Sequence, residues 1–117
     1  MQVEVRYNPN PTCEDDDDEI YFIFTTETGI EINLNFEGGG VEHQDWLRFI
    51  ERMNIREKAE LDFGESNGGS SIEYCSDKNQ VTFEMAKFGA GNGGSFSVTM
   101  PYDMCRSAFE QIKNYKK

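Results

Sequence analysis

An unbroken run of acidic side chains, Glu14 to Glu19, is the densest group of charges in the sequence. Carboxylates at alternate positions suit calcium, but an EF-hand loop also needs a glycine where this chain has Ile20, and a glutamate further on. We therefore expect no metal at this run. Clustered charge steers oppositely charged partners, so the run predicts a docking site for a basic protein. Its expected contacts are Glu14, Asp15, Asp16, Asp17 and Asp18.

The segment that follows the run, Ile20 to Phe24, is apolar on both faces, which is typical of a central or twice-covered strand. An acidic neighbour would also keep such a strand from pairing with strands of other chains. This gatekeeper role for the run and the docking role are both open from the sequence.

A second distinctive segment, Gly89 to Gly94, matches the G-x-G-x-x-G dinucleotide pattern. That pattern binds a pyrophosphate only where a helix opens at its last glycine, whereas residues 95–100 alternate as a strand does. We expect a hairpin connection whose backbone contacts a partner. The expected contacts are Gly89, Gly91, Asn92 and Gly93.

Residue types that usually carry catalysis are few. His43 is the single histidine, so no histidine cluster can hold a metal. Neighbouring anions raise the pKa expected for the Cys13 thiol. Cys105 falls on the predicted apolar stripe of a helix, whereas Cys75 falls on a solvent-exposed position of a strand. No pair of groups has a spacing diagnostic of nucleophilic catalysis. We expect no cofactor and no enzymatic activity, and Cys75 is the thiol expected to react with alkylating reagents.

Charge favours some partners over others. The formal net charge is −11, and residues 1–41 carry ten acidic residues against one basic residue, Arg6. One of these acidic residues, Glu37, is a further expected contact with the partner. Nucleic acids and anionic membranes bind surfaces with an excess of Lys and Arg. We therefore expect a basic protein partner, no direct nucleic-acid binding and no membrane binding.

The basic residues gather in one segment, where Arg48, Arg52 and Arg56 are spaced one helical turn apart. This spacing predicts either a solvated helix face or a contact with the acidic part of a second copy, which would give a homo-oligomer. The three cysteines are odd in number and far apart, and no signal segment or membrane span is evident. We expect a cytoplasmic protein in a reducing environment.

Hydrophobic periodicity predicts the elements that position these groups. Period-two alternation predicts strands near residues 2–7, 30–36, 59–63, 72–74, 81–85 and 96–100, and the apolar run predicts one more at 20–24. The helical period predicts helices over 46–53 and 101–112, the second opening at Pro101. The predicted order is βββ-α-ββββ-α.

We expect one α+β domain over residues 1–117, with a single, mainly antiparallel sheet of about seven strands and both helices packed on one face. A curl toward a partial barrel is the alternative. The uncovered face would be polar and mostly acidic. In a single sheet, the connections at 8–18, 37–40, 64–70 and 89–94 would share one edge, where recognition is expected.

These features predict a non-catalytic protein-binding domain, such as an acidic inhibitor, an immunity-type factor or a viral accessory protein. The acidic run and the glycine-rich edge would engage a basic partner, in one version by mimicking a nucleic acid. A structural subunit of a larger assembly is one alternative. Another is an enzyme acting on a small molecule, with carboxylates as acid and base beside the glycine-rich loops.

Overall fold

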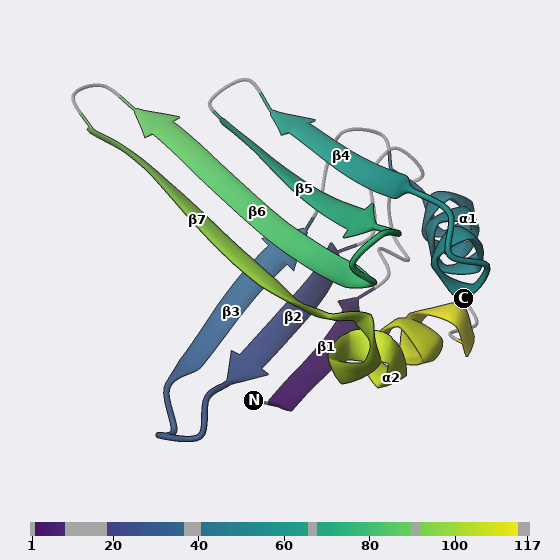
Figure 1. Ribbon diagram of the computed structural model, residues 1–117. Helices are drawn as coiled ribbons and strands as arrows, with labels where there is room; N and C mark the ends of the chain where they lie inside the picture. Colours follow the sequence, from purple (N-terminus) through teal and green to yellow (C-terminus); the bar gives the residue numbers. More distant parts are fainter. Residues whose placement is uncertain (1, 9–18, 37–40, 66–67, 90–91, 115–117) are drawn as a thin grey trace.

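The computed structural model describes residues 2–8, 19–36, 41–65, 68–89 and 92–114 (Figure 1). The strands and helices follow the predicted order βββ-α-ββββ-α. Pro101, expected to open the second helix, is instead the last residue of the preceding strand. The elements are β1 (Gln2–Asn8), β2 (Glu19–Thr25), β3 (Glu31–Phe36), α1 (His43–Asn54), β4 (Ala59–Glu65), β5 (Gly68–Cys75), β6 (Gln80–Gly89), β7 (Asn92–Pro101) and α2 (Tyr102–Asn114).

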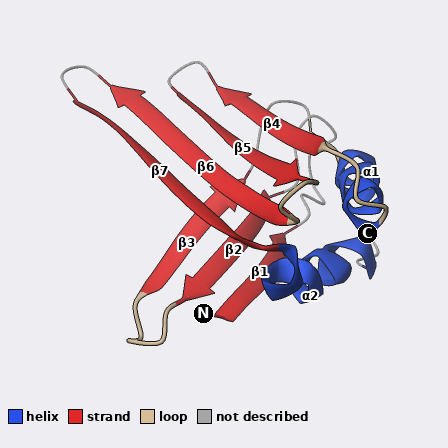
Figure 2. Cartoon of the chain, viewed as in Figure 1, coloured by secondary structure: helices blue, strands red, loops and turns tan. Residues whose placement is uncertain are grey.

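The strands form two antiparallel sheets, so the predicted single seven-stranded sheet is wrong. One sheet has the order β1-β2-β3 and the other the order β4-β5-β6-β7. Within the described strands, no pairing joins the two sheets into a barrel, curled or closed. The strands of the two sheets cross in Figure 2, and both helices lie at one side, away from the β4–β5 and β6–β7 hairpin ends.

The amount of apolar surface explains why two sheets form. Each sheet has an inner face on which most apolar side chains are buried, with Val3, Val5, Ile32, Met85 and Val98 partly buried, and the helices, of 12 and 13 residues, are too short to cover both faces. Turning the sheets toward each other lets each apolar face bury the other. The inner-face residues include Ile20, Phe22, Phe24, Leu34 and Phe36 on one sheet and Leu61, Phe63, Ile72, Phe83 and Met100 on the other.

Phe22 lies at the centre of this core. Its ring centroid is 4.9 Å from that of Phe83 in β6, 5.6 Å from that of Phe109 in α2 and 6.1 Å from that of Trp46 in α1. Strand β2 pairs on both sides, with β1 and β3, which confirms the central strand predicted for the segment Ile20 to Phe24. Both helices contribute side chains to one buried cluster together with the inner faces of the two sheets, so the prediction that both pack on one face of a single sheet is wrong in that form.

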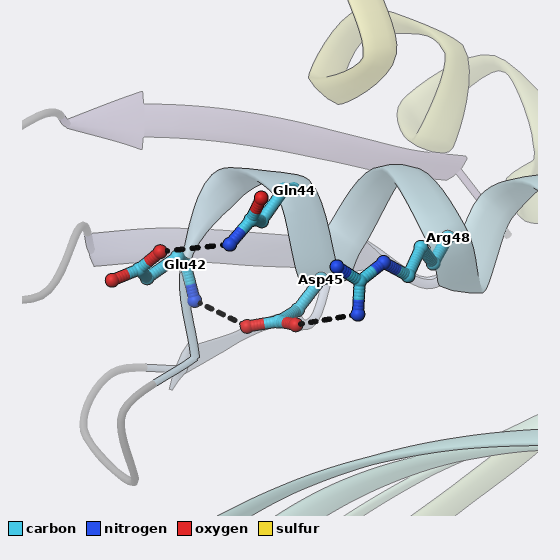
Figure 3. A network of polar contacts seen from close by, with 4 residues as sticks. All are labelled: Glu42, Gln44, Asp45 and Arg48. Carbon is cyan, nitrogen blue, oxygen red and sulfur yellow. Dashed lines mark hydrogen bonds and ion pairs between the residues drawn. The ribbon is translucent and has the colours of Figure 1, made fainter.

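Helix α1 begins with a reciprocal cap (Figure 3). The Asp45 carboxylate accepts a hydrogen bond from the backbone N–H of Glu42 through Oδ2, at 2.9 Å. Such a contact satisfies a donor that the start of a helix leaves without an intrahelical partner. The helix ends at Asn54, as predicted, and Arg56 just beyond it has a positive φ of 59°.

Two tyrosines join the helices to the β5–β6 turn, and we call them, with their two asparagine partners, the tyrosine clasp. The Tyr102 hydroxyl donates to Asn54 Oδ1 at 2.7 Å, which ties the start of α2 to the end of α1. The Tyr74 hydroxyl donates to Asn79 Oδ1 at 2.6 Å, and the backbone N–H of Tyr102 donates to the carbonyl of Asn79 at 2.9 Å. The clasp therefore fixes three chain segments at one point.

Candidate interaction surfaces

Most of the predicted contact residues are not placed by the structure. Glu14 to Asp18, Glu37 and Gly91 lie outside the described residues. Gly89 and Asn92 form the last pair of the β6–β7 ladder, and Gly93 is exposed beside them. The two glycines and the asparagine thus belong to the end of a hairpin, as predicted.

The expected shared edge depended on a single sheet, so it is wrong in that form. Gly68 pairs with Glu65 of β4 and with Lys87 of β6, which places the β4–β5 and β6–β7 hairpin ends at the same end of the four-stranded sheet. The other two connections leave from the three-stranded sheet. The four connections are therefore divided between two sheets.

An acidic surface covers the outer side of the four-stranded sheet, and we call it the acidic face. Glu60 of β4 lies directly across from Glu73 of β5, and both are exposed. Asp62 and Glu84 each pair with Ser71, so they occupy positions diagonal to Glu73. Four carboxylates thus project from three neighbouring strands. The sequence predicted that this side would be acidic but did not single out these residues as a site.

The acidic face carries no positive charge among its described residues. Most of the other positions hold hydroxyl, amide or small side chains, and two of the hydroxyls, of Thr82 and Thr99, lie 2.9 Å apart. Ion pairs within the described parts of the chain involve other residues, Asp45 with Arg48 and Glu110 with Arg106. Further described positions of the face include Gly64, Gly69, Ser71, Cys75, Gln80, Thr82, Ala86, Gly93, Ser95, Ser97, Thr99 and Pro101.

A groove of about 270 Å³ lies between α1 and β4, and we call it the α1–β4 groove. Its helix wall includes Asp45, Arg48 and Arg52, and its strand wall is the continuous stretch from Ala59 to Asp62. Arg48 reaches Asp45 at 3.8 Å, with its side chain 69% exposed (Figure 3). Arg56 was grouped with these arginines in the sequence, but it follows the end of α1 and does not line the groove.

The outer side of the three-stranded sheet has a shallow depression of about 450 Å³, lined by Arg6, Tyr21, Ile23 and Asn33. Ile23 is 6% exposed although it faces away from the core. The neighbouring Asn35 Oδ1 is buried without a hydrogen-bond partner. This surface offers an apolar floor beside one base and several amides.

The thiols are placed as the alternation predicts. Cys75 is exposed, Cys105 is buried, and Cys13 lies outside the described residues. Burial disfavours a charged thiolate and raises the pKa of Cys105 to about 12. Its sulfur lies 3.4 Å from the carbonyl of Tyr102. Cys105 is therefore a core residue and a poor nucleophile.

The described residues form neither a metal centre nor a membrane-spanning helix. Across residues 2–8, 19–36, 41–65, 68–89 and 92–114, no three side chains of His, Cys, Asp or Glu gather closely enough to hold a metal ion. The helices in those ranges are too short or too polar to span a bilayer. His43 is the first residue of α1.

Comparison with known proteins gives one match. No curated protein and no solved structure matches the chain significantly. One family model matches residues 31–111, which run from β3 into α2 and include the acidic face and the α1–β4 groove. The acidic run Glu14 to Glu19 precedes the matched region. Because the match spans more than half of the 117 residues, the chain belongs to the family of unknown function DUF5766.

Proposed function

We propose that this chain is a non-catalytic protein-binding domain that engages a basic partner protein. The observation that carries the proposal is the acidic face, where Glu60, Asp62, Glu73 and Glu84 project from neighbouring strands with no basic residue among the described positions. Lysine and arginine side chains of a partner would neutralise these carboxylates. An acidic inhibitor, an immunity-type factor or a viral accessory protein would work in this way.

The arrangement is unfavourable for folding alone, which supports a role in binding. Like charges directly across a strand pair, as at Glu60 and Glu73, destabilise a sheet. Natural sequences depart from such local rules mainly where function requires it. The neighbouring side chains of Ser71, Thr82 and Thr99 are short, so the carboxylates would be accessible to a flat basic surface.

The predicted loop contacts would add to this surface. Glu84 and Gly89 belong to the same strand, about 17 Å apart at 3.3 Å per residue, so one partner can span the acidic face and the glycine-rich hairpin end. Glu14 to Asp18 and Glu37 would supply long-range attraction that speeds encounter. The same charges would repel nucleic-acid phosphates and anionic membranes. The exposed thiol of Cys75 suits a reducing cytoplasm.

The groove between α1 and β4 bears on the enzyme alternative, because three carboxylates line it. Both carboxylate oxygens of Asp45 already have partners within the chain. Oδ2 accepts a hydrogen bond from the Glu42 N–H, and Oδ1 faces Arg48. Glu60 and Asp62 project from the same side of one strand instead of facing each other across the groove. These contacts favour a binding role over acid and base catalysis.

A titration with a defined basic probe tests the proposal. Octalysine is added to the isotopically labelled protein, and its affinity is measured for a Glu73→Gln/Glu84→Gln variant. We expect shifted amides on the acidic face and about a threefold loss of affinity for each carboxylate removed, typical of exposed ion pairs. The control variant, Glu27→Gln/Glu51→Gln, removes the same charge from exposed positions elsewhere. An equal loss in both variants would show that octalysine senses only net charge, which would contradict the proposal.

A further inference from the structure

The strand wall of the α1–β4 groove is the free edge of a sheet. β4 is terminal in the order β4-β5-β6-β7, so among the described strands it has a neighbour on one side only. Successive side chains of a strand point to opposite faces. A space lined by four successive residues, Ala59 to Asp62, must therefore run along the edge itself. That is the position a further strand would occupy.

The helix wall and the strand wall have similar lengths. Asp45, Arg48 and Arg52 share one face of α1, and the seven steps from Asp45 to Arg52 span about 10 Å along the helix axis. The three steps from Ala59 to Asp62 also span about 10 Å. The groove therefore has one helical wall and one extended wall of similar length.

The charges of the two walls differ in sign. Arg48 and Arg52 are about 6 Å apart along the helix axis, close to the ~6.8 Å between alternate residues of an extended chain. Glu60 and Asp62 repeat at that second spacing on the strand wall. An extended occupant would therefore meet arginines on one of its faces and carboxylates on the other.

We propose that the α1–β4 groove binds an extended segment of a partner protein as an added strand on β4, with alternating acidic and basic side chains. The acidic residues face Arg48 and Arg52, and the basic residues face Glu60 and Asp62. Backbone hydrogen bonds to the strand edge hold the segment, and the alternating charges set its register and its face. This surface shares Glu60 and Asp62 with the acidic face but differs from it, because it recognises carboxylates as well as bases.

The groove residues favour a different protein over a second copy as occupant. Two copies of β4 paired edge to edge would bring Glu60 and Asp62 of each against those of the other, and like charges at an edge discourage such pairing. The arginines can accept new partners. The Arg48 contact with Asp45 is long, at 3.8 Å, and no ion pair of Arg52 occurs in the described part of the chain.

The first test compares two peptides of identical composition. One is a blocked decapeptide of alternating Glu and Lys, and the other has five Glu followed by five Lys. We expect the alternating peptide to shift the amides of Ala59 to Asp62, to slow their hydrogen exchange, and to bind about tenfold more tightly than the block peptide. Equal affinity of the two peptides, or shifts confined to β7 or the hairpin ends, would overturn the proposal.

The second test uses protein variants. Arg48→Gln and Arg52→Gln should each weaken the alternating peptide about fivefold, the upper range for exposed ion pairs. The matched control is Arg106→Gln on α2, which removes the same charge from an exposed pair with Glu110 and should change nothing. Equal weakening by Arg52→Gln and the control would refute the assignment. A dimer in sedimentation that Arg52→Gln dissolves would assign the groove to a second copy and overturn the proposal as well.

Discussion

Phe109 is the residue whose truncation tests the packing most directly. Its side chain is fully buried, and its ring lies 5.6 Å from Phe22, 5.9 Å from Phe49 and 6.1 Å from Phe83, measured between centroids. These contacts join α2 to both sheets and to α1. Replacing Phe109 with alanine should therefore leave a cavity at the point where all the layers meet.

The expected cost of Phe109→Ala is about 4 to 5 kcal/mol of unfolding free energy. Buried Phe→Ala substitutions cost about 3 to 5 kcal/mol, and each aromatic contact adds about 0.5 to 1.5 kcal/mol beyond burial, which favours the upper half of the range. For a chain of 117 residues, a loss of about 4 kcal/mol corresponds to a drop of about 16 °C in Tm.

Urea unfolding followed by tryptophan fluorescence measures the effect of Phe109→Ala. Trp46 is the single tryptophan, it is 2% exposed, and it stacks on Phe22, so its emission reports on the same core. The control is Phe96→Ala, at a side chain that is 38% exposed and should cost about 1 kcal/mol or less. A loss below about 2 kcal/mol for Phe109→Ala, or equal losses in the two variants, would refute the packing described above.

Two further predictions concern the acidic run and the thiols. Replacing Asp15 to Asp18 with asparagine should slow association with a basic partner, and most strongly at low salt, where the Debye length is ~30 Å at 0.01 M. A gatekeeper role predicts a lower refolding yield instead. An association rate that is unchanged across the salt series would leave the run without a recognition role. At pH 8 an alkylating reagent should modify Cys75 but reach Cys105 only after unfolding. Burial raises the pKa of Cys105 from 9.0 to about 12, so its contribution to stability is present below pH 9 and is lost as pH rises toward 12. Cys105→Ala should flatten that alkaline decline in urea unfolding, and an unaltered slope would contradict it.

Local structure followed from the sequence, because side-chain period reports which face of an element is buried. The alternation of Ile32, Leu34 and Phe36 and the helical spacing of Trp46, Phe49 and Ile50 predict the strand β3 and the helix α1 correctly. The same period does not say what covers a buried face. Either a helix or a second sheet can bury the apolar face of a strand. The division into two sheets therefore could not be derived from the alternation of side chains.

The surfaces were predictable to different degrees. Strand parity alone places Glu60, Glu73 and Glu84 on a common side, so the acidic face was foreseen as a polar surface. The α1–β4 groove was not foreseen, because it requires β4 to be at a sheet edge, and edge position depends on the order of strands in space. The prediction that Arg56 lies on the same helix face as Arg48 and Arg52 failed, because the helix ends at Asn54, two residues before Arg56.

The packing of α2 on β1 joins the first and last elements of the described chain, and this has a consequence for synthesis. The ribosome makes β1 and β2 long before α2, so the inner face of β2 stays without part of its cover through most of translation. Phe22 and Phe24 are then exposed in a nascent chain that cannot yet complete its core. An extended apolar strand in that state is prone to aggregation. The carboxylates of Glu14 to Glu19 emerge just ahead of this strand, so under the gatekeeper interpretation their charge would protect it during the interval when the rest of the fold does not exist.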